Sequence, residues 1–198
     1  MTGNLALSAE KHPHHVRREE IVDYQTYEDC RTERRRQAMA VKAPRRIHLG
    51  EQLTFLFENH DTMRYQIQEI MRAEKIVRDA AISQELITYN DLLGGVGQLG
   101  CALLIEVDDE TERKKTLKEW LGLQEHLYAV DDKGGRAYAE FNPSQVGTDR
   151  LSAVQYLKFT PASAPVALGC DFPDVIVEVK LEEAQRVALA EDLAATMG

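Results

Sequence analysis

The sequence is poor in cysteine and in long apolar runs. Its three cysteines, Cys30, Cys101 and Cys170, lie far apart, and no CxxC pair occurs. This spacing indicates neither a zinc ribbon nor a disulfide framework. No apolar run reaches the ~18 residues that a membrane-spanning helix needs, and residues 1–20 contain no apolar signal core. We therefore expect a cytoplasmic protein.

Basic residues are also scarce relative to acidic ones. The chain has 24 Lys and Arg against 33 Asp and Glu, which gives a formal net charge of −9. This balance favours solubility and argues against a protein that binds nucleic acid over much of its surface. A hydrophobic share of 43% in 198 residues is enough for one ordinary core. We predict a flexible tail at 1–18, an α+β domain at 19–160, and a proline-containing connection with a last strand and helix at 161–198.

Three histidines lie near the N-terminus, in the run KHPHH. Pro13 and the mixed charges around it give no helical or strand period, so a solvated terminus is the simpler interpretation. The alternative is a clip for a divalent metal formed by His12, His14 and His15, which would need further ligands from elsewhere in the chain.

A helix is predicted over 23–41, with Asp23 as its N-cap and Pro44 just beyond its end. This segment is dense in arginine although the protein is acidic. Two interpretations stay open: a solvated basic face that pairs with nearby glutamates, or a docking patch for phosphate, nucleotide or an acidic partner. The candidate docking residues are Arg31, Arg34, Arg35, Arg36, Arg45 and Arg46.

The segment 53–75 packs many polar side chains next to apolar ones. LTFLF at 53–57 is apolar on both faces, which predicts an interior strand. Asn59 and Asp61 then offer N-caps for a helix over about 62–77. We expect the rest of the chain to be organised around this strand and helix.

A helical wheel places Glu74 within the apolar stripe that includes Met63 and Ile67. A second, partly apolar side of the same helix carries Glu69 and Arg72 at the i,i+3 spacing of an ion pair. Carboxylates held inside a structure must be paired, hydrogen-bonded or neutral. The helix therefore contributes either to a structural ion-pair network or to a polar pocket with shifted pKa values.

A second amphipathic helix is predicted over 79–93. Glu85 and Tyr89 lie one turn apart on it, and a hydrogen bond between them is either structural or positions a substrate or metal. Gly95, Gly97 and Gly100 then match G-x-G-x-x-G by letter. They follow a helix and open a strand, the reverse of a dinucleotide-binding loop, so we expect a helix cap and a turn.

The remaining pattern predicts an α+β fold with an antiparallel or mixed sheet of about five to six strands and helices packed mainly on one face. Two further helices are expected at 108–121 and 181–197. Glu106, near the end of the second strand, is a further candidate for the polar cluster. The predicted strands are 53–57, 101–107, 126–130, 136–141, 151–160 and 174–180.

The runs LGEQLTFLFENHDTMRYQIQEIMRAEKI, ELITYNDLLGG, LIEV and SAVQYLKF resemble an uncharacterised bacterial family, domain of unknown function 3501. The resemblance covers roughly 20–160, and the FEN…T..YQIQE..R.E block is specific to it. His60 departs from the family pattern, which more often has a cation such as Arg there. The residues that the resemblance marks as family-typical are Phe57, Glu58, Asn59, Thr62, Arg64, Gln66, Gln68, Glu69, Arg72, Glu74, Glu85, Tyr89, Asn90, Ala153, Val154, Gln155 and Tyr156.

The resemblance implies partners among rubrerythrin-like or iron–sulfur oxidoreductase proteins, and so a role in redox or oxidative-stress metabolism. The first hypothesis is therefore a cytoplasmic accessory or binding protein that uses the basic patch for docking. No cofactor and no catalytic residue is assigned. Nucleic-acid binding through 31–46 is a third and weaker alternative, and we also consider self-association of the chain.

The second hypothesis is an enzyme or a small-anion- or metal-binding domain with a carboxylate–arginine pocket between the two central helices, 62–77 and 79–93. Arg64 or Arg72 would hold an anionic group, and Glu69, Glu85 or Glu106 would act as a base or a metal ligand. The helix pair contains no Glu-x-x-His motif, which counts against a di-iron centre. The candidate pocket residues are Glu58, Asn59, Arg64, Gln68, Glu69, Arg72, Glu74, Glu85, Tyr89 and Glu106.

Overall fold

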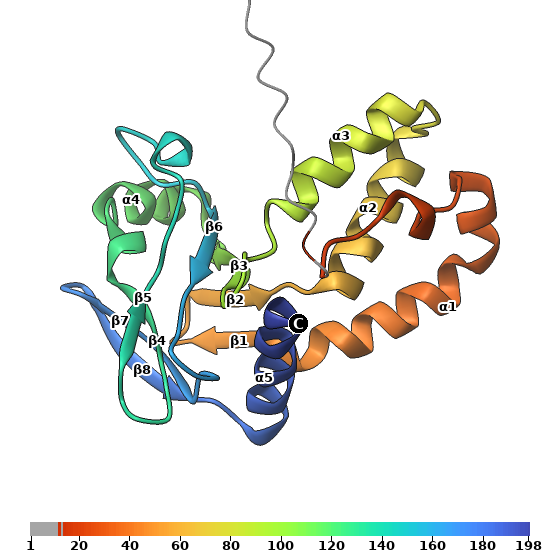
Figure 1. The fold of residues 1–198 in the computed structure, drawn as a ribbon. Coiled ribbons are helices and arrows are strands. Elements are labelled where there is room, and N and C mark those ends of the chain that lie inside the picture. Colours follow the sequence, from red (N-terminus) through yellow and green to blue (C-terminus); the bar gives the residue numbers. More distant parts are fainter. Residues whose placement is uncertain (1–11, 13) are drawn as a thin grey trace, which may run out of the picture.

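An arm of three helices extends from a body built mainly of strands (Figure 1). The computed structural model describes residue 12 and residues 14–198. The predicted α+β class is confirmed. The prediction of one sheet with five to six strands is wrong, because the strands of the described residues form two four-stranded antiparallel sheets.

The predicted helices are all present. Asp23 caps α1 by accepting hydrogen bonds from the backbone N–H groups of Gln25 and Thr26. Asn59 caps α2, and the helix ends before Lys75, whose backbone is left-handed with φ 52°. No helix in the described part of the chain is long and apolar enough to cross a membrane. The helices are α1 Tyr24–Lys42, α2 His60–Glu74, α3 Asp79–Asn90, α4 Glu110–Glu119 and α5 Glu183–Met197.

The first sheet has the order β1-β2-β3-β6, and all its neighbours are antiparallel. Its strands are β1 Arg46–Leu49, β2 Leu53–Phe57, β3 Leu99–Ile105 and β6 Val154–Phe159. The LTFLF strand is interior, as predicted. In its register Leu53 pairs with Ile105 at one end and Phe57 pairs with Cys101 at the other.

The second sheet has the order β5-β4-β7-β8, again antiparallel throughout. Its strands are β4 Leu127–Val130, β5 Arg136–Tyr138, β7 Ala167–Phe172 and β8 Val175–Lys180. The hairpin predicted at DDKGG joins β4 to β5. Apolar side chains of both sheets meet in one buried cluster, which includes Phe55 and Phe159 from the first sheet and Leu168 from the second. Leu189 and Leu193 of α5 complete it, so the C-terminal helix is part of the body's core.

A second and separate cluster holds the arm together. Met63, Ile67 and Met71 of α2 pack there against Ile82 of α3 and against Val16, which precedes α1. The Val16 backbone also exchanges two hydrogen bonds with the side chain of Asn90, both of 2.9 Å. Part of the segment for which we predicted a flexible tail is thus buried in the arm. Most of that predicted tail, residues 1–11 and 13, lies outside the described residues.

Two strands have no counterpart among those predicted. β1 is only four residues long and directly follows Arg45, within the run that we interpreted as basic surface. β7 lies in the segment predicted to be a connection, yet it is an interior strand of the second sheet. Its middle residue is Gly169, where a Cβ atom would lie 2.3 Å from the ring of Tyr128. Small residues permit this contact, and they also remove the β-branched signal by which a strand is recognised.

The glycine-rich segment between α3 and β3 forms a turn, as predicted, although α3 ends at Asn90, well before the Gly94–Gly95 pair that we expected to cap it. Gly100 lies in β3 at the point where the arm joins the body. A Cβ atom on Gly100 would lie 2.0 Å from the carbonyl oxygen of Leu92, a backbone atom with little freedom to move. The third glycine of the motif therefore serves close backbone packing.

We predict that Gly100→Ala lowers the free energy of unfolding by about 3 kcal/mol, because the added methyl group forces the Leu92 backbone away from β3. Chemical denaturation followed by circular dichroism measures the change. Gly95→Ala is the matched control, since its Cβ would meet only the flexible side chain of Gln98, at 3.3 Å. Equal losses in the two variants would contradict this account.

Candidate functional site

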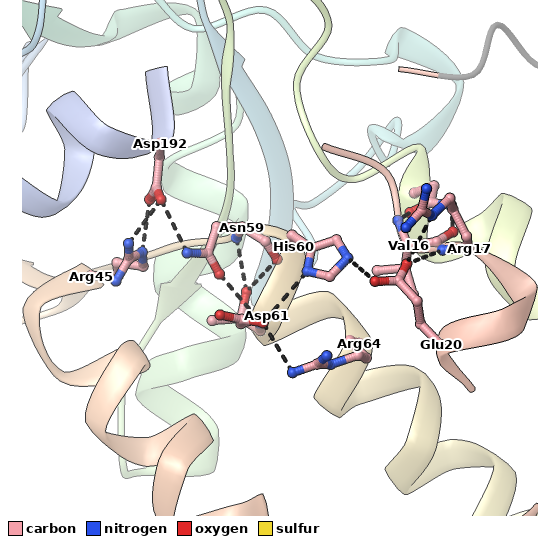
Figure 2. A network of polar contacts seen from close by, with 11 residues as sticks. Val16, Arg17, Glu20, Arg45, Asn59, His60, Asp61, Arg64 and Asp192 are labelled. Carbon is pink, nitrogen blue, oxygen red and sulfur yellow. Dashed lines mark hydrogen bonds and ion pairs between the residues drawn. The ribbon is translucent and has the colours of Figure 1, made fainter. Parts of the chain in front are cut away.

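The turn from β2 to α2 is where the arm meets the body, and it gathers the polar groups that connect them (Figure 2). The side chain of Asn59 accepts the N–H of Thr62 at 3.1 Å, while its Nδ2 donates to Asp192 of α5 at 3.0 Å. The N–H of Glu58 donates to the Gly100 carbonyl at 3.0 Å. One short turn thus contacts the sheet, the helical arm and the C-terminal helix.

A buried ion pair lies beside this turn. Arg45 donates through Nε and Nη2 to the two carboxylate oxygens of Asp192, at 2.7 and 2.8 Å, and its Nη1 donates to the Val41 carbonyl at 2.7 Å. Both side chains are only 8% exposed. Arg45 therefore does not lie on an exposed docking surface, which corrects its place in the predicted basic patch. The pair joins the end of α1 to α5.

His60 forms the other side of the network. Its Nε2 lies 2.9 Å from Glu20, and its Nδ1 lies 3.4 Å from Asp61, which also accepts from Arg64 at 3.1 Å. The hydrogen bonds with Asp61 and Glu20 raise the pKa of His60 above its ordinary value, although burial opposes them. His60 therefore has cationic character at the position where the family resemblance implies a cation.

The predicted Glu69–Arg72 pair is present but secondary, with 3.7 Å between its atoms. The closer partners of Glu69 come from α1: Arg31 donates through Nε and Nη2, each at 2.9 Å, and Tyr27 donates its hydroxyl proton at 2.7 Å. These bonds, chiefly those from Arg31, hold the pKa of Glu69 below its ordinary value. A carboxylate so strongly held in its ionised form is a poor base. The contacts fit the structural interpretation of this helix.

The other carboxylates predicted for the pocket do not converge on Glu69. Glu74 is exposed rather than buried in an apolar stripe. Among the described residues, no hydrogen bond joins Glu85 to Tyr89. The pKa of Tyr89 is raised mainly by burial. Glu106 is exposed and accepts from Thr54.

The sheet register explains the position of Glu106. Glu58 follows the Phe57–Cys101 end of the β2–β3 pair, whereas Glu106 follows the Leu53–Ile105 end. With about 3.3 Å per strand residue, the two ends are separated by roughly 13 Å. Glu106 is therefore not part of a site at the β2–α2 turn.

The remaining arginines of the predicted basic patch have different surroundings. Arg34 donates through Nε to the sulfur of Cys30 at 3.1 Å, and Arg35 donates to the Tyr65 hydroxyl at 2.9 Å. Arg36 forms a bidentate pair with Glu33 on the exposed side of α1. Arg46 is exposed on β1.

Two pockets adjoin the network, one on each side of Asp61. The first, called the helix pocket below, lies between α1 and α2 and has a volume of ≈ 100 Å³. The sequence hypothesis placed a pocket between α2 and α3 instead. The helix pocket is lined by Tyr27, Arg34, Gln37, Ala38, Val41, Asp61, Arg64, Tyr65 and Gln68.

The second pocket, called the junction pocket below, has a volume of ≈ 90 Å³ and lies between the β2–α2 turn, the glycine-rich segment and α5. Its lining includes Glu58 and Asn59, which the sequence hypothesis named, and also His14 and Asp192, which it missed. A signal for Asp192 exists in the sequence: it lies between Leu189 and Leu193 on the face of α5 that is buried. We interpreted that helix only by its Ala and Glu content.

The three N-terminal histidines are neighbours in space, with ring centroids 4.9–5.6 Å apart. Within the described residues no group of three or more His, Cys, Asp or Glu side chains is placed to hold a metal ion. Burial lowers the pKa of His15 to about 4, which keeps this ring neutral. The histidines thus pack on the fold, and no metal clip is formed by the described part of the chain.

The sequence matches a known family over residues 15–193. The chain belongs to the DUF3501 family. Its description is a protein of unknown function. The match extends well past residue 160, where we expected the resemblance to end, so β7, β8 and α5 belong to the family fold.

A solved structure supports the same conclusion. The chain is similar to a novel protein of unknown function from Burkholderia pseudomallei K96243, with 28% sequence identity and a TM-score of 0.81. The similarity covers 90% of this chain and 98% of the other. No curated protein matches the chain.

We predict that Arg45→Met lowers the free energy of unfolding by about 3–5 kcal/mol, because it leaves Asp192 buried without its cation. The double variant Arg45→Met/Asp192→Leu should recover most of this loss, since it removes both charges and fills the space with apolar atoms. Denaturant unfolding of the single and double variants measures the coupling. If the unfolding free energy lost in the double variant equals the sum of the losses from the two single substitutions, the two residues are not coupled and this prediction is wrong.

We predict a pH-dependent stabilisation by His60. A histidine whose pKa is raised in the folded state stabilises it fully below the unfolded pKa of about 6.5, and this contribution is lost as pH rises through the folded value. The stability difference between the wild type and His60→Gln should therefore shrink from pH 6 to pH 8, as measured by urea unfolding at each pH. A constant difference would contradict the ion pairs drawn in Figure 2. Taking the difference cancels the opposite contribution of His15, whose pKa is lowered by burial and by charges other than that of His60.

Proposed function

We propose that this chain is a binding protein that holds a small anionic ligand, a carboxylate or phosphate group, in the helix pocket between α1 and α2. The observation that supports it is the pair of guanidinium groups, Arg34 and Arg64, that two different helices bring to one pocket. Arginine is well suited to this role because its planar donors match two oxygens of a carboxylate or phosphate.

Both arginines are available for a ligand. Within the described residues no carboxylate pairs with Arg34, whose contact is the sulfur of Cys30. Arg64 pairs with Asp61, and these side chains are 36% and 51% exposed. Such solvent-exposed pairs contribute at most about 1 kcal/mol. A ligand anion can therefore replace Asp61 on Arg64 at little cost.

Neutral donors add to the two cations. Tyr65 accepts a hydrogen bond from Arg35, so its own hydroxyl proton is free to be donated to a ligand oxygen. Lys42 lies over the same ring, 5.7 Å from its centroid. Cationic groups thus gather on this part of α1 and α2 although the whole chain has a charge of −9. A local positive region is what attracts a small anion to an acidic protein.

Binding fits this pocket better than catalysis. Two of the ionisable groups there are already engaged: Tyr27 donates to Glu69, and the hydrogen bond with His60 holds the pKa of Asp61 below its ordinary value. Neither is poised near neutral pH, where an effective general base or acid would titrate. The proposal therefore takes from the first sequence hypothesis that the chain is a binding protein. It takes from the second the arginine pocket, but places it between α1 and α2 instead of between α2 and α3.

A redox role stays a prediction. The resemblance implied rubrerythrin-like or iron–sulfur partners, and the proposal leaves room for them around the exposed Arg35 of α1 and Arg46 of β1. A pull-down at low salt, where contacts between exposed charges are strongest, is the direct test.

We predict that isothermal titration calorimetry detects binding of phosphate or succinate to the wild-type protein at low salt. Arg34→Gln and Arg64→Gln should each weaken binding about 10- to 100-fold, because each removes a charge-assisted hydrogen bond worth about 1.5–3 kcal/mol. Arg36→Gln is the matched control, since Arg36 is on the same helix α1 but does not line the pocket. The proposal fails if neither anion binds, or if the control weakens binding as much as the other two variants.

A further inference from the structure

The junction pocket brings together four segments that are distant in the sequence. His14 comes from the chain before α1, Glu58 from the β2–α2 turn, Leu99 from the start of β3, and Asp192 from α5. It shares only Asp61 with the helix pocket. Its chemistry is also different, so it requires a separate explanation.

Two buried polar atoms of this pocket have no hydrogen-bond partner among the described residues: Oε2 of Glu58 and Nδ1 of His14. Each residue is 8% exposed. Buried polar atoms in native proteins are nearly always paired, and an unpaired one in a cavity points to a group that the protein chain does not supply. Here two such residues line the same pocket.

The neighbouring contacts show which kind of group is missing. Nε2 of His14 lies 2.7 Å from the Gly94 carbonyl oxygen, which can only accept, so Nε2 carries the proton and donates it. Burial lowers the pKa of His14 and keeps the ring neutral. Nδ1 is then a bare acceptor, and so is the Glu58 carboxylate in the ionised form that a cationic ligand would stabilise. The pocket therefore needs a hydrogen-bond donor.

The charge of the lining favours a cationic donor. Three carboxylates, Glu58, Asp61 and Asp192, line the pocket, whereas His60 is the one cationic group among the described lining residues. Asp192 is neutralised by Arg45, and Asp61 is shared between His60 and Arg64. Glu58 forms no ion pair with another described residue, and burial raises its pKa although Lys42 and Arg45 act in the opposite direction. A cation that entered the pocket would find Glu58 as its counter-ion.

We propose that the junction pocket binds a small molecule through a primary ammonium group, which donates hydrogen bonds to Glu58 and His14. The aliphatic part of the ligand would lie against Leu93, Leu99 and Ala195, which also line the pocket. An ammonium group carries three donors on one atom, so it can serve both acceptors at once.

Two other occupants fit less well. A water molecule needs only about 10–15 Å³, whereas the pocket has ≈ 90 Å³, and water brings no charge to Glu58. A metal ion would need further ligands, and the described residues place no group of three metal-binding side chains together. An organic ammonium ion matches the size, the charge and the acceptors.

Thermal unfolding in the presence of n-propylammonium chloride tests the proposal. At about ten times its dissociation constant, the probe should raise the midpoint of the wild-type protein by about 3–6 °C, because it binds only the folded state. Neither n-propanol, which has the same shape without the charge, nor sodium chloride at the same ionic strength should do so. An equal rise with n-propanol, or no rise at all, would overturn the proposal and leave ordered water as the occupant.

The variant Glu58→Gln tests whether n-propylammonium raises the unfolding midpoint by binding in the junction pocket. This variant keeps the shape of the side chain but removes the negative charge, so the response to n-propylammonium should disappear. Glu74→Gln is the matched control, since Glu74 is exposed and outside the pocket, and it should respond as the wild type does. A full response in Glu58→Gln would place the binding elsewhere. The anion-site variant Arg34→Gln and its control Arg36→Gln should also respond normally, so the two proposals can fail separately.

A second measurement detects the ligand contact in the wild-type protein itself. In nitrogen NMR spectra of the wild-type protein, the unprotonated Nδ1 of His14 should give a signal that shifts when n-propylammonium binds, because it then accepts a hydrogen bond. The signal is assigned by its loss in His14→Gln. If the midpoint rises but this signal does not move, the ammonium group is not held by His14 and the proposed geometry is wrong.

Discussion

The ion pair between Arg45 and Asp192 is the contact on which the arrangement of arm and body depends. The two residues are separated by 147 positions and form two charge-assisted hydrogen bonds in a buried setting. Burying two charges is favourable only when their geometry is tightly held. Asn59 donates to the same carboxylate, so a single aspartate orients the end of α1, the start of α2 and α5. The shape of the junction pocket follows from these three elements.

A polar connection between the two parts has a physical reason. Each part has its own apolar cluster. Where the two parts meet, the backbone passes from the end of strand β2 to the start of helix α2. Helix starts leave N–H groups without partners, and buried ones must be satisfied by side chains. Asn59 and Thr62 cap α2 reciprocally, and Gln68 exchanges two hydrogen bonds with the Val22 backbone. Much of the FEN…T..YQIQE block is explained by this connection.

Local patterns predicted the local structure well. The caps at Asp23 and Asn59, the interior strand 53–57 and the five helices all follow from neighbouring residues. Glu74, which we expected to be buried, shows the limit of such local patterns. The helical wheel assumed that the helix continues to Val77, whereas α2 ends before Lys75. Which sides of α2 are buried also depends on where α1 packs, and the wheel does not contain that information. Pairings such as Arg45 with Asp192 depend on the tertiary fold, so spacing along the chain does not reveal them.

The two proposed sites meet at Asp61, and this explains why they have opposite character. On the side of α1, Arg34 and Arg64 outnumber this one carboxylate, which leaves a positive pocket. On the side of α5, Asp61 is shared with His60, and the nearby Glu58 forms no ion pair with another described residue. An anion bound to Arg64 would free Asp61 from its arginine and make the junction side more negative. On both proposals, we therefore expect electrostatic coupling, in which an anion in the first site favours an ammonium ligand in the second.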